Sequence, residues 1–162
     1  MSKYESAAMW KLYATGGFGI AIRSTINRLI NSIPEGDALG TDGAALHVEF
    51  GAVQYVDHHR DSNPFSGLQQ PTWEFFMKRK SFEYEQEFRA LVYGMPLLRD
   101  GVESVFPDDG VAVPVDLVRL IESIYVAPGA PAWFLETVRG AVLRAGHDFP
   151  VHQSGLDEPA LF

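Results

Sequence analysis

The residues best suited to chemistry lie near the middle of the chain, where acidic and basic side chains alternate with apolar ones. The charged set is Glu85, Glu87 and Arg89. Side chains of a β-strand point alternately to its two faces, so this spacing predicts a strand over residues 85–93. One face would carry both carboxylates and the guanidinium, and the other would bury Phe88, Ala90 and Val92. A strand face that is only exposed to solvent does not need two carboxylates and a guanidinium together, so we expect a functional site here.

The spacing of Glu85 and Glu87 is similar to the Glu-x-Glu motif of mono-ADP-ribosyltransferases. Such enzymes attack C1′ of the nicotinamide ribose through a transition state with oxocarbenium character. A carboxylate that accepts a hydrogen bond from the ribose hydroxyl favours the developing positive charge, and a second carboxylate can orient or deprotonate the acceptor. The resemblance therefore implies NAD as a substrate, Glu87 as the principal catalytic carboxylate and Glu85 as its assistant.

The same resemblance implies a set of residues that hold the dinucleotide. Those enzymes use an arginine on an early strand and a Ser/Thr motif, and Arg23 followed by Ser24 fits that description. Arg23 and Arg89 would bind an anion, and Tyr13 or Trp10 would stack on the nicotinamide ring. Aromatic residues on an amphipathic helix also serve as core residues, so Trp10 and Tyr13 have that second interpretation.

The alternative is that the charged residues are structural. Glu85, Glu87 and Arg89 would then form an exposed ladder of ion pairs, and Lys78 to Lys80 would be a solvated turn. In this interpretation the chain is a non-enzymatic interaction module, such as an accessory protein of a bacterial stress or defence system. Its partner would be a protein, whereas the enzyme would act on a nucleotide or a protein substrate.

Metal-binding patterns are weak. Asp57, His58, His59 and Asp61 lie close in sequence, but adjacent histidines on an extended chain point apart and are poor ligands for one metal ion. No His-x-x-x-His spacing, Walker loop, dinucleotide glycine motif or nucleophile elbow is present. We therefore expect no metal site.

Length, composition and charge exclude several classes of protein. A chain of 162 residues with 46% hydrophobic residues can form one domain with a proper core. The net charge of −8 argues against a nucleic-acid surface, which needs clustered lysine and arginine. The absence of cysteine excludes disulfides, thiol catalysis and cysteine-based metal sites. Without a long apolar run or a signal-peptide pattern, the sequence predicts a soluble cytoplasmic protein with no membrane segment.

The local patterns predict an α+β domain over residues 1–162, with one mixed or mostly antiparallel sheet packed with about four helices. Apolar periodicity and capping residues predict helices at about 5–14 with Ser6 as N-cap, from Ser24 or Thr25 to 33, at 71–79 and at 130–145, and a helical turn capped by Asp116. Strands are expected at 18–24, 46–56 with a turn or bulge at Gly51, 85–93, 111–115, 121–126 and 151–154. The continuous apolar run at 18–24 suggests a strand with both faces covered.

These elements, in this order, resemble the bacterial family catalogued as domain of unknown function 2971. The segments that carry the resemblance are 5–13, 19–22, 53–55, Lys78 with 82–89, and 121–126 with the helix after Pro128. Members of that family usually have a further strand, helix and Asn-Asp motif before the first of these segments. The resemblance implies that this chain corresponds to the C-terminal two-thirds of a family domain. We therefore also expect an apolar patch or an unpaired strand edge near the first helix and the 18–24 strand.

Overall fold

The computed structural model describes residues 5–34, 46–57, 72–94 and 112–157. The chain divides into two compact units, each described by itself below. The first unit is residues 33–114, and the second unit combines residues 2–32 with 115–162. The α+β class is confirmed, but the described strands form three small sheets instead of the one sheet expected. The organisation as a single domain stays a prediction.

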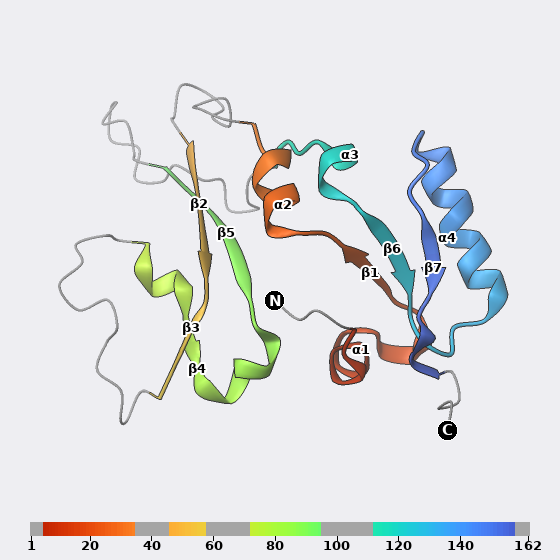
Figure 1. The fold of residues 1–162 in the computed structure, drawn as a ribbon, viewed down its shortest axis with the longest axis horizontal. Coiled ribbons are helices and arrows are strands. Elements are labelled where there is room, and N and C mark those ends of the chain that lie inside the picture. Colours follow the sequence, from red (N-terminus) through yellow and green to blue (C-terminus); the bar gives the residue numbers. More distant parts are fainter. Residues whose placement is uncertain (1–4, 35–45, 58–71, 95–111, 158–162) are drawn as a thin grey trace, which may run out of the picture. The chain divides into compact units, whose positions relative to one another are not determined.

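The second unit is built on a three-stranded mixed sheet in the order β1-β6-β7 (Figure 1). Strand β1 (Ile20–Arg23) is antiparallel to β6 (Ser123–Val126), and β6 is parallel to β7 (Val151–Gln153). Helix α4 (Ala132–Arg144) packs on β6 and β7 through Phe134, Val138 and Val142. The buried centre of this unit is Ile121, Ile124, Val126 and Val151.

Capping side chains set where the shorter helices of the second unit begin. Helix α1 (Ala7–Tyr13) starts after Ser6, whose side chain accepts a hydrogen bond from Met9 N, as predicted. For α2 (Ile26–Ser32) the cap is Thr25, whose Oγ1 accepts from Arg28 N at 3.2 Å. Asp116 caps α3 (Leu117–Leu120) by accepting from two backbone N–H groups. Short 3₁₀ turns follow α1 and β7, at Thr15–Gly17 and Gly155–Asp157.

Several expectations for the second unit are wrong in detail. All four residues of β1 are exposed, so this strand is not covered on both faces. Exposed apolar side chains do occur in that region, as expected: Leu12 and Tyr13 on α1, Phe18 just before β1, and Ile20 and Ile22 on β1. At the boundary of the two units, described residues 112–115 of the strand expected at 111–115 form no strand, because Pro114 lacks the N–H that a ladder needs.

The described part of the first unit contains two paired ribbons. Strand β2 (Leu46–Ala52) is antiparallel to β5 (Phe88–Gly94), and β3 (Gln54–Val56) is parallel to β4 (Met77–Arg79). Two 3₁₀ helices flank β4, at Trp73–Phe76 and Lys80–Glu85. The helix expected at 71–79 is therefore wrong, because the chain turns to extended backbone at Met77. Most of the loop predicted at 57–70 and most of that at 94–110 lie outside the described residues. Of the acidic and histidine group considered for a metal, Asp57 is described, whereas His58, His59 and Asp61 lie outside the described residues.

Gly51 remains in regular register opposite Arg89, and the strand is interrupted at Val53 instead. A side chain at Gly51 would collide with Phe76, whose ring carbons lie 2.8 Å from the position of a Cβ. Glycine is thus required by the close approach of a buried ring, not by a bulge. The core-facing set of β5 is also only partly as expected: Phe88 and Val92 are half-buried, but Ala90 is exposed.

We predict that Gly51→Ala destabilises the protein by about 1 to 3 kcal/mol, because the added methyl group overpacks a rigid aromatic ring. Urea unfolding measures the change. Gly140→Ala is the matched control, since the added methyl group in α4 meets only the flexible end of Arg144 at 3.2 Å. The control should be neutral or more stable, because alanine favours a helix over glycine by about 1 kcal/mol. Equal stability of Gly51→Ala and the unmodified chain would contradict the packing argument.

Candidate functional site

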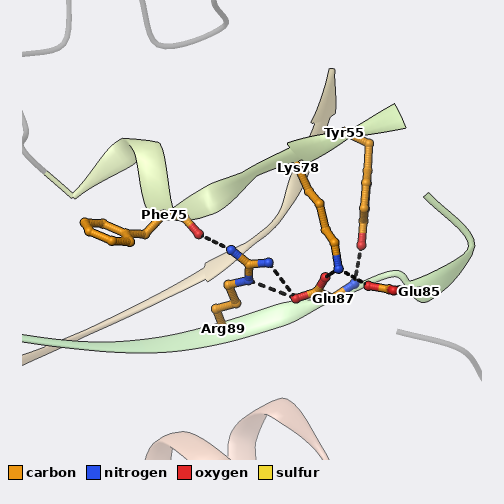
Figure 2. A network of polar contacts seen from close by, with 6 residues as sticks. All are labelled: Tyr55, Phe75, Lys78, Glu85, Glu87 and Arg89. Atoms are coloured by element: carbon orange, nitrogen blue, oxygen red, sulfur yellow. Dashed lines mark hydrogen bonds and ion pairs between the residues drawn. The ribbon is translucent and has the colours of Figure 1, made fainter. Parts of the chain in front are cut away.

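Four charged residues of the first unit form a connected group, which we call the charge cluster: Lys78, Glu85, Glu87 and Arg89 (Figure 2). Lys78 lies in the middle of β4, and Glu85 ends the following 3₁₀ helix. Glu87 lies just before β5, and Arg89 is the second residue of that strand. The cluster therefore ties together three consecutive pieces of backbone.

The ammonium group of Lys78 is shared between the two carboxylates. Its Nζ donates to Glu85 Oε2 and to Glu87 Oε1, the latter at 2.5 Å. The other oxygen of Glu87, Oε2, accepts from Arg89 Nε at 2.9 Å and lies 2.8 Å from Arg89 Nη2. Both oxygens of Glu87 are thus bound by cations, in a chain that runs from Glu85 to Arg89.

Neighbouring groups hold the members of the charge cluster in place. The backbone of Glu87 donates to Tyr55 Oη at 2.8 Å and accepts from Val53 N at 3.0 Å. Arg89 Nη1 also donates to the carbonyl oxygen of Phe75. The Lys78 ammonium lies 4.8 Å from the centroid of the Phe82 ring, which adds a cation–π contact. These partners come from parts of the first unit that are far apart in sequence.

The local fold brings the carboxylates together by a turn, which corrects the prediction of a strand from Glu85. Residues 80–85 are a 3₁₀ helix, and Gln86 has a left-handed backbone with φ of 48°. This residue reverses the chain between the helix and the strand, which begins only at Phe88. Glu85, Glu87 and Arg89 are nevertheless grouped as predicted. Lys78 bonds both glutamates, and Glu87 also pairs with Arg89.

Partial burial strengthens these contacts. The exposed fractions of the side chains are 6% for Glu85, 24% for Glu87, 25% for Lys78 and 34% for Arg89. Hydrogen bonds from Arg89, and then from Lys78, outweigh the effect of burial and lower the pKa of Glu87 to about 2. Hydrogen bonds to Glu85 and Glu87 raise the pKa of Lys78 above its usual value. Both pKa changes favour the charged forms, so Lys78 is held as an ammonium group and Glu87 as a carboxylate.

The charge cluster contains two cations and two anions, so its formal charges cancel. A carboxylate with a pKa of about 2 is a poor proton acceptor, which makes Glu87 unsuited to general base catalysis. It could stabilise a positive charge only if Lys78 or Arg89 moved away, because both now neutralise it.

The remaining predicted site residues belong to the second unit. Arg23 pairs with Glu122 at 3.3 Å and contacts Tyr125 Oη at 3.5 Å, and the hydrogen bond to Tyr125, followed by the charge of Glu122, raises its pKa. Ser24 Oγ donates to Leu120 O at 2.6 Å. On α1, Trp10 Nε1 donates to Glu5 at 3.1 Å, and Tyr13 is exposed. The structure thus joins Glu85, Glu87 and Arg89 within one unit, and their role with Arg23, Ser24, Tyr13 and Trp10 stays a prediction.

Two members of the site were missed by the sequence analysis. Lys78 was interpreted as part of a solvated turn, but it is a half-buried strand residue at the centre of the charge cluster. Tyr55, whose hydroxyl contacts the Glu87 backbone, was predicted only as part of a strand and not as a site residue. In the described residues, no three histidine, aspartate or glutamate side chains gather as a metal site. Nor is any described helix long and apolar enough to cross a membrane.

Comparisons with known proteins give no match: no family model fits the chain, and no curated protein or solved structure is similar to it. The resemblance to the family of domain 2971 therefore stays a prediction.

We predict that the contribution of Glu87 to stability depends on pH. The pKa of Glu87 falls from an ordinary 4.5 to about 2 on folding, so the stabilisation is complete above pH 4.5 and is lost as the pH falls towards 2. Urea unfolding should show that Glu87→Gln is less stable than the unmodified chain at pH 6. This gap should shrink steadily between pH 4.5 and 2. A gap that stays constant over this range would contradict the ion pairs of Glu87.

We also predict that Lys78→Met destabilises the first unit, because it removes the ammonium group shared by Glu85 and Glu87 while keeping a side chain of similar length. Lys80→Met is the control, since Lys80 is exposed and lies two residues away. Hydrogen exchange of the β3, β4 and β5 amides should accelerate in Lys78→Met only. Equal exchange in the two variants would argue against a shared ammonium group.

Proposed function

We propose that this chain is a non-enzymatic interaction module whose charge cluster has a structural role. The observation that carries the proposal is that both carboxylates of the Glu-x-Glu motif are already bound by cations of the same unit. Their charges are cancelled, and Glu85 is almost fully buried. Breaking such a pair leaves a buried charge uncompensated and is strongly destabilising, so the charge cluster would hold its three backbone segments together.

Catalytic carboxylates normally need the opposite environment. A base must have a pKa near the working pH, and a carboxylate that stabilises a cation must present its charge to the substrate. Glu87 has a pKa of about 2, and its field is cancelled by Lys78 and Arg89. A substrate would have to displace one of these cations before it could use the carboxylate.

Exposed aromatic residues of the second unit support a binding role. Phe18 is 51% exposed and Trp133 is 60% exposed, and their ring centroids lie 5.6 Å apart. Aromatic side chains are enriched at protein interfaces, where they supply large contact areas at a small cost in conformational entropy. Since the net charge of −8 disfavours nucleic acid, the partner we propose is a protein.

ADP-ribosyl transfer with NAD as substrate is the second candidate. It is favoured by the convergence of the Glu85 and Glu87 carboxylates on one ammonium group, which places them close enough to act on a single ribose. Glu87 and Arg89 also keep part of their surface exposed. In this mechanism Glu87 would accept from the ribose hydroxyl and Glu85 would orient the acceptor, while Arg89 would bind the dinucleotide.

Glu87→Gln separates the two functions, because the amide keeps the shape of the side chain and removes its charge. If the charge cluster is structural, we expect a loss of about 1 kcal/mol or more, since a partly buried charged hydrogen-bond acceptor is removed. We also expect no binding of NAD by calorimetry and no release of nicotinamide by the unmodified chain. Glu83→Gln, at an exposed position of the same 3₁₀ helix, should leave stability within about 0.5 kcal/mol of the unmodified value.

The opposite set of results would establish the enzyme. NAD would bind, nicotinamide would be released, and Glu87→Gln would lower the rate by orders of magnitude with little effect on unfolding. In that case the structural interpretation of the charge cluster would be abandoned.

A further inference from the structure

Strand β1 is an apolar edge strand. Among the described residues it pairs with β6 alone, so its other side lies at the edge of the β1-β6-β7 sheet (Figure 1). Ile20 is 53% exposed and Ile22 is 54% exposed, although both are large aliphatic residues. Natural sheets usually protect such an edge with charge, proline or a bulge. Residues 20–23 contain no proline, and their one charged residue, Arg23, is the last of the strand. An edge of this kind favours pairing with another strand.

The two isoleucines continue the hydrophobic face of the sheet. Ile20 is opposite Val126 and Ile22 is opposite Ile124, and directly opposite residues of antiparallel strands share a face. Val126 and Ile124 belong to the buried centre under α4, so the apolar face extends from the core onto β1. A strand added beyond β1 would cover this exposed extension.

The backbone of β1 determines which residues can pair on the open side. Gly19 O accepts from Ala127 N at 2.9 Å, so Gly19 is bonded towards β6. Along an antiparallel strand, the backbone N–H and C=O groups of successive residues point alternately to the two neighbouring strands. The backbone groups of Ala21 therefore also point to β6, and those of Ile20 and Ile22 point to the open edge. The residues with exposed apolar side chains are therefore the ones with outward-facing backbone groups.

We propose that β1 pairs antiparallel with β1 of a second copy of this chain, about a two-fold axis that passes through Ala21. In this register Ile20 lies opposite the partner's Ile22, and the two exchange both of their outward-facing hydrogen bonds. Ala21 meets the partner's Ala21 on the other face, where its small side chain permits close approach. The two-fold axis places Ile20 of each copy opposite Ile22 of the other, so the exposed apolar side chains meet each other.

Charge is compatible with this arrangement. Arg23 is the only charged residue of β1, and it is paired with Glu122 of its own chain at 3.3 Å. In the proposed register Arg23 lies opposite the partner's Gly19, which leaves room for its side chain. The two arginines stand at opposite ends of the paired strands. Because the strands are short and each chain carries a net charge of −8, we expect a weak dimer that strengthens with protein concentration and with salt.

A single cysteine tests the register directly, because the natural chain has none. In Ala21→Cys the two thiols would face each other across the axis in a non-hydrogen-bonded pair, with Cα atoms about 4.5 Å apart, which suits a disulfide. In Ile20→Cys the equivalent Cα atoms would be about 8 Å apart, beyond the reach of a disulfide. Leu143→Cys, exposed on α4, reports cross-linking by random collision.

Under mild oxidation we expect Ala21→Cys to form a covalent dimer at least tenfold faster than the other two variants. Sedimentation velocity should independently show that the cysteine-free chain self-associates with increasing concentration. Ile22→Lys should remain monomeric, whereas Leu143→Lys should behave like the unmodified chain. Equal cross-linking rates in the three cysteine variants, or a monomer at every concentration, would overturn the proposal. If the chain is a monomer at every concentration, a strand of another protein becomes the candidate partner for the edge of β1. The inference does not depend on the role of the charge cluster.

Discussion

One ammonium group, that of Lys78, holds the described part of the first unit in its observed arrangement. It bonds the carboxylates of Glu85 and Glu87, which flank the left-handed residue Gln86. A carboxylate that is 6% exposed would be costly without such a partner, because an ionised group loses most of its hydration on burial. Lys78 in β4 therefore stabilises the turn at Gln86, after which β5 begins at Phe88.

The rest of the unit is arranged around that constraint. Once Glu87 is fixed, its backbone bonds Tyr55 Oη and Val53 N, and its second carboxylate oxygen binds Arg89. Arg89 reaches the carbonyl of Phe75, next to the buried ring of Phe76 that packs against Gly51. Ionic networks of this kind add little net stability compared with an apolar core, and we infer that this one favours one register over its alternatives. Here the register at stake is that of β2 with β5.

The sequence was informative where structure depends on neighbours in the chain. Ser6, Thr25 and Asp116 cap helices as their side chains predict, and the turn at Pro128-Gly129 is followed by the expected long helix. The sequence was a poor guide where contacts between residues far apart in the chain determine the local structure. Nothing near Gly51 in sequence indicates the ring of Phe76, and residues 77–79 have a helical pattern but pair with β3 as a strand. Propensity is a weak guide when a neighbouring strand supplies hydrogen bonds for the backbone.

The Glu-x-Glu motif shows why spacing alone does not define a site. On a regular strand, residues two apart share a face and lie about 6.6 Å from each other, so each carboxylate can meet a ligand separately. In this chain a left-handed residue lies between the two glutamates, and both side chains converge on one lysine. The same residues at the same spacing thus form a neutral cluster instead of a pair of available acids. The backbone conformation of Gln86 and the position of Lys78 decide whether the two glutamates are available acids or part of a neutral cluster. A sequence motif could include Lys78, but it could not include the backbone conformation of Gln86.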